Sequence, residues 1–141
     1  MKILAGLQQT PEGEAAFARA VEEARKHDAE LVLVAFVHSP TGEESGRSYE
    51  RERKTARQAA EQVAAPLRES GMTVGVHVPV GVTKPSQALL RVASQEHADL
   101  LVIGVRRRSR VGKLVLGSNA QDIILQADAP VLAVKADDGD G

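Results

Sequence analysis

The sequence predicts one α/β domain, built as an open parallel five-stranded sheet in the order 3-2-1-4-5 with helices on both faces. Three observations support this prediction. The chain has 141 residues, a length that suits a single domain. Strand-like apolar segments alternate with amphipathic helical segments, and the connections are long enough for parallel crossovers. Residues 31–37 are apolar throughout, which is typical of a strand covered on both faces.

The first strand is predicted at residues 3–7, and it leads into a helix that begins after Thr10. Thr10 followed by Pro11 is a helix-start signal, because the hydroxyl caps a free N–H group and proline is tolerated at the first helical position. The apolar face of this helix comprises Phe17, Ala20, Val21 and Ala24. The second strand follows at residues 31–37.

A surface loop is expected at residues 38–48, and a long helix follows it. The apolar face of that helix comprises Ala56, Ala60, Val63 and Leu67. On the exposed face, Glu50 and Lys54 are expected to form an i,i+4 pair. Pro66 is expected to weaken the last turns, because proline lacks the N–H that a helix interior uses.

The second half of the chain repeats the alternation of strand and helix. Residues 72–80 alternate between apolar and polar, and Pro79 predicts that this third strand lies at a sheet edge. After Pro85 a helix is expected, with an apolar side formed by Leu89, Val92 and Ala93. The fourth strand, at residues 100–103, ends at Gly104. The last helix is expected to be capped by Ser118, with an apolar side formed by Ala120, Ile123, Ile124 and Ala127.

The fifth strand is predicted at residues 131–134, so the domain is expected to span residues 1–135 and to be followed by a disordered acidic tail at residues 136–141. Hydrophobic residues make up 43% of the chain but aromatic residues only 2%, so aliphatic side chains must form the core. The lack of cysteine excludes disulfides, thiol nucleophiles and thiolate metal sites. We find no signal peptide or membrane span, and therefore expect a cytoplasmic protein that does not contact membranes.

The segment at residues 104–118 contains the strongest functional signal. In a sheet of this order, ligands bind beyond the carboxyl ends of the strands where the winding reverses, here between Gln8 and Gly104. Glycine lets backbone N–H groups approach an anion, and Gly117 with Ser118 opens a helix whose N-terminus offers further N–H groups. Basic side chains lie between them: Arg106, Arg107, Arg108, Arg110 and Lys113. The segment therefore predicts a phosphate-binding loop.

The spacing of Gly104, Gly117 and Ser118 resembles the signature Gly-x2-Gly-x9-Gly-Ser/Thr of the universal stress protein family, and the resemblance extends from Lys2 to Val134. It implies a protein that binds ATP or another adenine nucleotide, with Mg²⁺ accompanying ATP, and that acts in stress response through its conformation or its partners. Any ATP hydrolysis is expected to be slow and incidental. The resemblance also implies a homodimer joined through the last strand, Val131 to Val134.

Residue by residue, the resemblance implies three groups of nucleotide contacts. At the adenine and ribose end it places Gly6, Gln8 and Phe36. Beside the ribose it places Ile103 and Gly104, and at the phosphates it places Gly117, Ser118 and Asn119.

Two departures from the family pattern leave an alternative open. Arg107 stands where the second signature glycine is expected, and Gln8 stands where the first strand usually ends in aspartate. Arg107 could replace a backbone contact to phosphate by a charged one. The alternative is a dimeric stress-response interaction protein that does not bind nucleotides. We do not expect nucleic acid as a partner, because no aromatic residues accompany the arginines to stack on bases.

Other kinds of site lack their sequence patterns. The four histidines show no metal-ligand spacing, and no Gly-x-Ser-x-Gly motif is present. Gly112 and Lys113 are followed by leucine, so the loop is not the P-loop of hydrolases. We therefore predict no catalytic residue and no metal-binding residue.

Overall fold

The computed structural model describes residues 1–39, 46–107 and 114–136. Arg108, Arg110 and Lys113 of the predicted phosphate loop, and residues 137–141 of the predicted tail, lie outside the described residues. Ala136, which we assigned to the tail, is the last residue of a strand.

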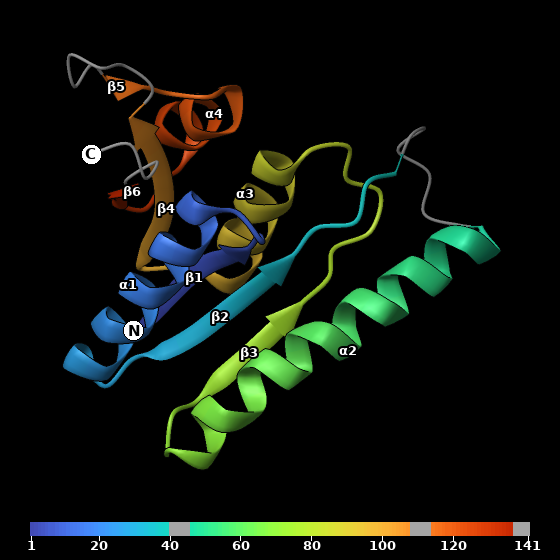
Figure 1. The fold of residues 1–141 in the computed structure, drawn as a ribbon, viewed down its shortest axis with the longest axis horizontal. Coiled ribbons are helices and arrows are strands. Elements are labelled where there is room, and N and C mark those ends of the chain that lie inside the picture. Colours follow the sequence, from blue (N-terminus) through green and yellow to red (C-terminus); the bar gives the residue numbers. More distant parts are fainter. Residues whose placement is uncertain (40–45, 108–113, 137–141) are drawn as a thin grey trace.

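Within the described residues, five parallel strands form the sheet, with an additional short strand at one end (Figure 1). The strands are β1 (Lys2–Leu7), β2 (Glu30–Ala35), β3 (Val74–His77), β4 (Leu100–Arg107), β5 (Leu114–Val115) and β6 (Val131–Ala136). The parallel order is β3-β2-β1-β4-β6, which confirms the predicted order 3-2-1-4-5 with β6 as the fifth strand. The two-residue β5, which we did not predict, pairs antiparallel with the end of β4.

In the part of the chain that the structure describes, four helices cover the two faces of the sheet: α1 (Pro11–His27), α2 (Arg47–Glu69), α3 (Pro85–Glu96) and α4 (Ser118–Gln126). On one face, Ile3 and Ala5 of β1 pack with residues of α1 and α2. On the other face, Leu4 packs with residues of α3 and α4. Figure 1 shows α2 lying along β3, the edge strand. Each core consists almost wholly of aliphatic side chains, as the composition requires.

The start of α1 agrees with the sequence pattern. Thr10 is the N-cap, and its Oγ1 accepts a hydrogen bond from the Gly13 N–H at 3.0 Å, with Pro11 in the first turn. The helix ends at His27, and the C-cap residue Asp28 adopts a left-handed conformation with φ of 51°.

In α2 the structure corrects two details, the buried face and the partner of Glu50, and shows how the helix accommodates Pro66. The helix runs through Pro66 to Glu69, because Pro66 lies on the exposed side while Ala64 and Leu67 pack on the sheet. Ala64 is buried in place of Val63, which is 38% exposed. Glu50 pairs with Arg53 at 3.3 Å rather than with Lys54, because Arg53 is already turned toward the carbonyl oxygen of Val78.

The predicted element ends differ in the second half as well. β3 is shorter than expected and stops before Pro79, which has no N–H to donate to a neighbouring strand. β4 extends beyond Gly104 to Arg107, because β6 pairs with it as far as Arg106 and β5 pairs with Arg106 and Arg107. Gly117, not Ser118, is the N-cap of α4, and Ile124 is 44% exposed rather than packed. No helix in the described ranges is long and apolar enough to cross a membrane.

Candidate functional site

A pocket lies at the carboxyl ends of β1, β2 and β4, where the direction of winding reverses. It encloses about 620 Å³ of space, a volume that includes the open solvent at its mouth. Its wall on the strand side comprises Gly6, Leu7, Gln8, Val34, Phe36, Val102, Ile103 and Gly104. The helices contribute Glu12, Gly13, Ala16, Pro85, Ser86, Ala88, Leu89, Asn119, Ala120 and Ile123.

The pocket brings together six of the nine residues that we predicted from the sequence. These are Gly6, Gln8, Phe36, Ile103, Gly104 and Asn119. Gly117 and Ser118 are exposed and lie next to the pocket, at the start of α4. Arg107 ends β4, and its side chain lies outside the described part of the chain.

Two of the glycines allow α1 to close onto the sheet beside the pocket. A Cβ atom on Gly104 would lie 1.9 Å from the carbonyl oxygen of Glu12, and one on Gly13 would lie 2.4 Å from the carbonyl oxygen of Gln8. Neither distance is compatible with a side chain, so both positions require glycine for packing. Gly117 differs, because among the described atoms nothing lies within 4 Å of the place that its Cβ would occupy.

Three helix N-termini converge on the pocket, but they differ in their capacity to attract an anion. Thr10 already caps α1, and Glu12 and Glu14 place negative charge in its first turn. The N-cap of α4 is Gly117, which has no side chain, and the first turn of this helix contains no acidic residue. The first turn of α3 also contains no acidic residue, but Pro85 has no N–H and the N–H of Ser86 already donates to Asn119. The N-terminus of α4 is therefore the best anion-binding element at the site.

A polar cluster that we did not predict from the sequence joins the start of α3 to α4. The amide of Ser86 donates to Oδ1 of Asn119 at 2.9 Å, and the Ser86 hydroxyl donates to Oδ2 of Asp122 at 2.8 Å. Lys84 Nζ lies 2.8 Å from the same oxygen. The hydrogen bond from Lys84, and then that from Ser86, lowers the pKa of Asp122. Since Oδ1 of Asn119 is used here, its NH₂ group is the part that can donate to a ligand.

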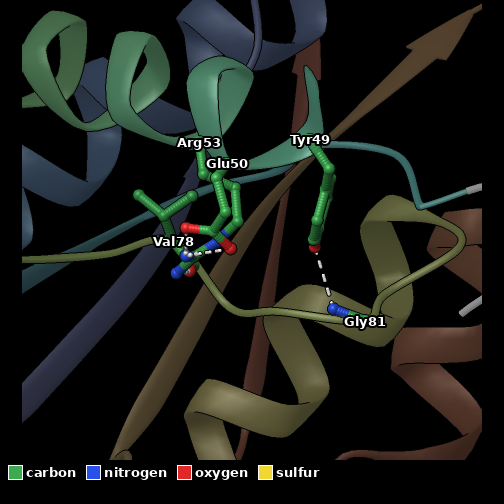
Figure 2. A network of polar contacts seen from close by, with 5 residues as sticks. All are labelled: Tyr49, Glu50, Arg53, Val78 and Gly81. Atoms are coloured by element: carbon green, nitrogen blue, oxygen red, sulfur yellow. Dashed lines mark hydrogen bonds and ion pairs between the residues drawn. The ribbon is translucent and has the colours of Figure 1, made fainter. Parts of the chain in front are cut away.

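The loop that leads into α3 is held by side chains of α2 (Figure 2). The Tyr49 hydroxyl oxygen accepts a hydrogen bond from the Gly81 N–H at 2.8 Å, and Arg53 Nη2 donates to the carbonyl oxygen of Val78 at 2.5 Å. Arg91 of α3 donates to the carbonyl oxygen of Val80. These contacts fix the path of the loop and thereby position Ser86 at the pocket.

Sequence reasoning missed Glu12, Ser86 and Asp122. Pro85 marked the start of a helix at the ligand-binding edge of the sheet, and this signal could have indicated Ser86. No local sequence pattern could have predicted the hydrogen bond between Ser86 and Asp122, because the two residues lie on different helices. Within the described residues, no group of three or more His, Cys, Asp or Glu side chains is placed to hold a metal ion.

Comparison with known proteins gives consistent matches over almost the whole chain. The model of the universal stress protein family matches residues 1–135. A universal stress protein of Mycolicibacterium smegmatis is 37% identical over 133 residues, which cover 94% of this chain and 96% of the relative. The solved structure of a universal stress protein from Archaeoglobus fulgidus has a TM-score of 0.70 at 29% identity, with coverage of 96% and 98%. A structure of the universal stress protein from this organism in complex with dAMP has a TM-score of 0.67 at 26% identity, with coverage of 96% and 98%.

Proposed function

This chain belongs to the universal stress protein family, and from that premise we propose that it binds an adenine nucleotide in the pocket at the carboxyl ends of β1 and β4. The observation that supports the proposal most strongly is the pairing of an apolar wall with an uncapped helix N-terminus. Val34, Phe36 and Leu89 form part of the wall, and α4 begins beside it. An apolar cavity with a few polar groups at its ends suits a flat base that is joined to phosphate.

The residues present fit the parts of such a ligand. Gly6 and Phe36 would contact the adenine, and Gln8 would offer the base or ribose both an amide donor and a carbonyl acceptor. Ile103 and Gly104 would flank the ribose. Gly117, Ser118 and the NH₂ group of Asn119 would face the phosphates at the start of α4. Mg²⁺ would arrive with ATP and be held mainly by its phosphate oxygens, because Mg²⁺ commonly binds through substrate phosphates.

A substitution at Gly6 tests the location. A Cβ atom there would lie 3.9 Å from the nearest atom, the carbonyl oxygen of Val34, so Gly6→Val should fold while its side chain enters the pocket. Gly75→Val is the matched control, because a Cβ on Gly75 would also lie 3.9 Å from its nearest neighbour, on a strand outside the pocket. Calorimetric titration with ATP, ADP, AMP and adenosine should show affinity lowered roughly tenfold or more by Gly6→Val, equivalent to about 1.4 kcal/mol, and unchanged by Gly75→Val.

The result also separates the two classes of function. If the folded wild-type protein binds no adenine nucleotide at millimolar concentration, the proposal is wrong and the alternative stands, a dimeric interaction protein without a nucleotide. Equal affinities of Gly6→Val and the wild type would place the ligand elsewhere.

We also propose that the protein is a homodimer joined through β6, that it acts in stress response through conformation or partners, and that ATP turnover is slow and incidental. The edge position of β6 supports the dimer, because an edge strand presents unpaired backbone groups. A cytoplasmic location and a domain spanning residues 1–135 remain predictions from the sequence.

A further inference from the structure

Glu12 and Arg106 form an ion pair on the α1 side of the pocket. The Nε atom of Arg106 lies 3.4 Å from Oε2 of Glu12, and the two side chains are 35% and 27% exposed. Glu12 lines the pocket from the first turn of α1. Arg106 lies two residues beyond Gly104, and therefore on the same side of β4 as the Gly104 position that α1 covers.

The Glu12–Arg106 ion pair leaves one buried atom of each side chain without a hydrogen bond in the described part of the chain. Both Oε2 of Glu12 and Nε of Arg106 are shielded from solvent, and in the described part of the chain neither atom has a hydrogen-bond partner. Buried charged groups are usually hydrogen bonded, because leaving one without a partner costs free energy. By contrast, Lys84 and Asp122 approach to 2.8 Å, and Ser86 adds a hydrogen bond to Asp122. The Glu12–Arg106 contact is therefore one that a better anionic partner can replace.

The carboxylate of Glu12 fills the place at the N-terminus of α1 that would otherwise attract an anion. This carboxylate lies at the positive end of α1 and beside the guanidinium of Arg106. The helix end and the guanidinium both attract negative charge. A phosphate that enters the pocket near α1 meets the carboxylate of Glu12, which repels it, and it can reach the guanidinium of Arg106 only by displacing that carboxylate. The repulsion grows with the number of phosphate charges.

We propose that Glu12 is an internal competitor for the phosphate groups of the ligand: it engages Arg106 in the free protein and lowers the affinity for nucleotides with longer phosphate chains. This inference rests on the proposed function, since it concerns the same pocket. Glu12 thereby sets the preference of the site, which favours adenosine and AMP relative to ATP.

The test is the dependence of affinity on phosphate number. Glu12→Gln removes the charge and keeps the shape, so the helix should fold as before. We expect it to tighten ATP binding roughly tenfold and adenosine binding by less than about twofold, with AMP and ADP between them. Titration calorimetry at low ionic strength measures all four, because salt would screen the effect.

Two further variants make the result specific. Glu14→Gln makes the same charge change in the same helical turn, but Glu14 faces the neighbouring groove between α1 and α2, so it should change the four affinities little. In the double variant with Glu12→Gln and Arg106→Gln, the gain for ATP should largely disappear, because no guanidinium is released to the phosphates.

The outcomes distinguish the inference from the proposed function. If Glu12→Gln leaves the ratio of ATP to adenosine affinity unchanged, or shifts it toward adenosine, Glu12 does not compete and the inference is wrong while the nucleotide site stands. If neither the wild type nor Glu12→Gln binds any of the four ligands, both are wrong.

Discussion

At the scale of single residues, Gly104 and Gly117 belong to one spaced motif but have opposite surroundings. Gly104 lies directly under the backbone of Glu12, whereas the space beside Gly117 is open among the described atoms. Gly117 has φ of −71°, a value that any residue adopts. The first glycine is therefore required for packing, and the second leaves space that a ligand can occupy.

We expect Gly104→Ala to lower the free energy of unfolding by at least about 1–3 kcal/mol, because a methyl group there forces α1 away from β4. Gly117→Ala should cost less than about 1 kcal/mol, the modest penalty for alanine at an N-cap. Urea unfolding followed by circular dichroism measures both. Similar losses in the two variants would show that α1 does not depend on Gly104 as the geometry requires.

The positions of Gly104 and Gly117 could be predicted from the sequence, but their different structural roles could not. Spacing alone identified Gly104 and Gly117. The contact of Gly104 with Glu12 joins segments far apart in the chain, and no local pattern encodes such a contact. The ion pair between Glu12 and Arg106 also joins distant segments of the chain, so no local sequence pattern predicts it.

At the scale of elements, Asp122 joins α4 to the start of α3 through Lys84 and Ser86. Its folded-state pKa lies below the ordinary value of 3.8. The ionised carboxylate therefore contributes stability above the unfolded-state pKa, and this contribution is lost as the pH falls through the lower folded-state pKa.

We predict that Asp122→Asn lowers the urea midpoint at neutral pH, and that the gap from the wild type narrows below about pH 4. The exposed Asp128, in the loop after α4, provides the control Asp128→Asn, which should stay close to the wild type throughout. A gap for Asp122→Asn that stays constant down to about pH 2.5 would mean that the charge of Asp122 is not what joins the two helices.

The existence of the elements was easier to predict than their ends. Periodicity identified the four helices and the five parallel strands that the described residues form. Their ends depend on tertiary contacts: packing of Ala64 and Leu67 carries α2 through Pro66, and pairing with β6 extends β4 past Gly104. The two-residue β5 exists only through its pairing with Arg106 and Arg107, and it has no periodicity of its own.

At the scale of the whole molecule, the order of the strands places one strand, β6, at the open edge beside β4. The direction of its backbone groups follows from the register. The Leu101 N–H donates to the carbonyl oxygen of Pro130, and Leu101 is paired with Val131. In a parallel pair, residues 130, 132 and 134 then point their backbone groups at β4, and residues 131, 133 and 135 point theirs outward.

This geometry gives a direct test of the homodimer proposed through β6. Ala133→Pro removes one outward N–H group from an exposed position and leaves the hydrogen bonds to β4 intact, a substitution that edge strands tolerate. Light scattering after size exclusion should find the wild type dimeric and Ala133→Pro mostly monomeric, with the circular dichroism spectrum retained. Ala133→Ser keeps the N–H and should remain dimeric. If Ala133→Pro stays a dimer at micromolar concentration, the subunits join through another face, because strand pairing at β6 requires the N–H that the proline lacks.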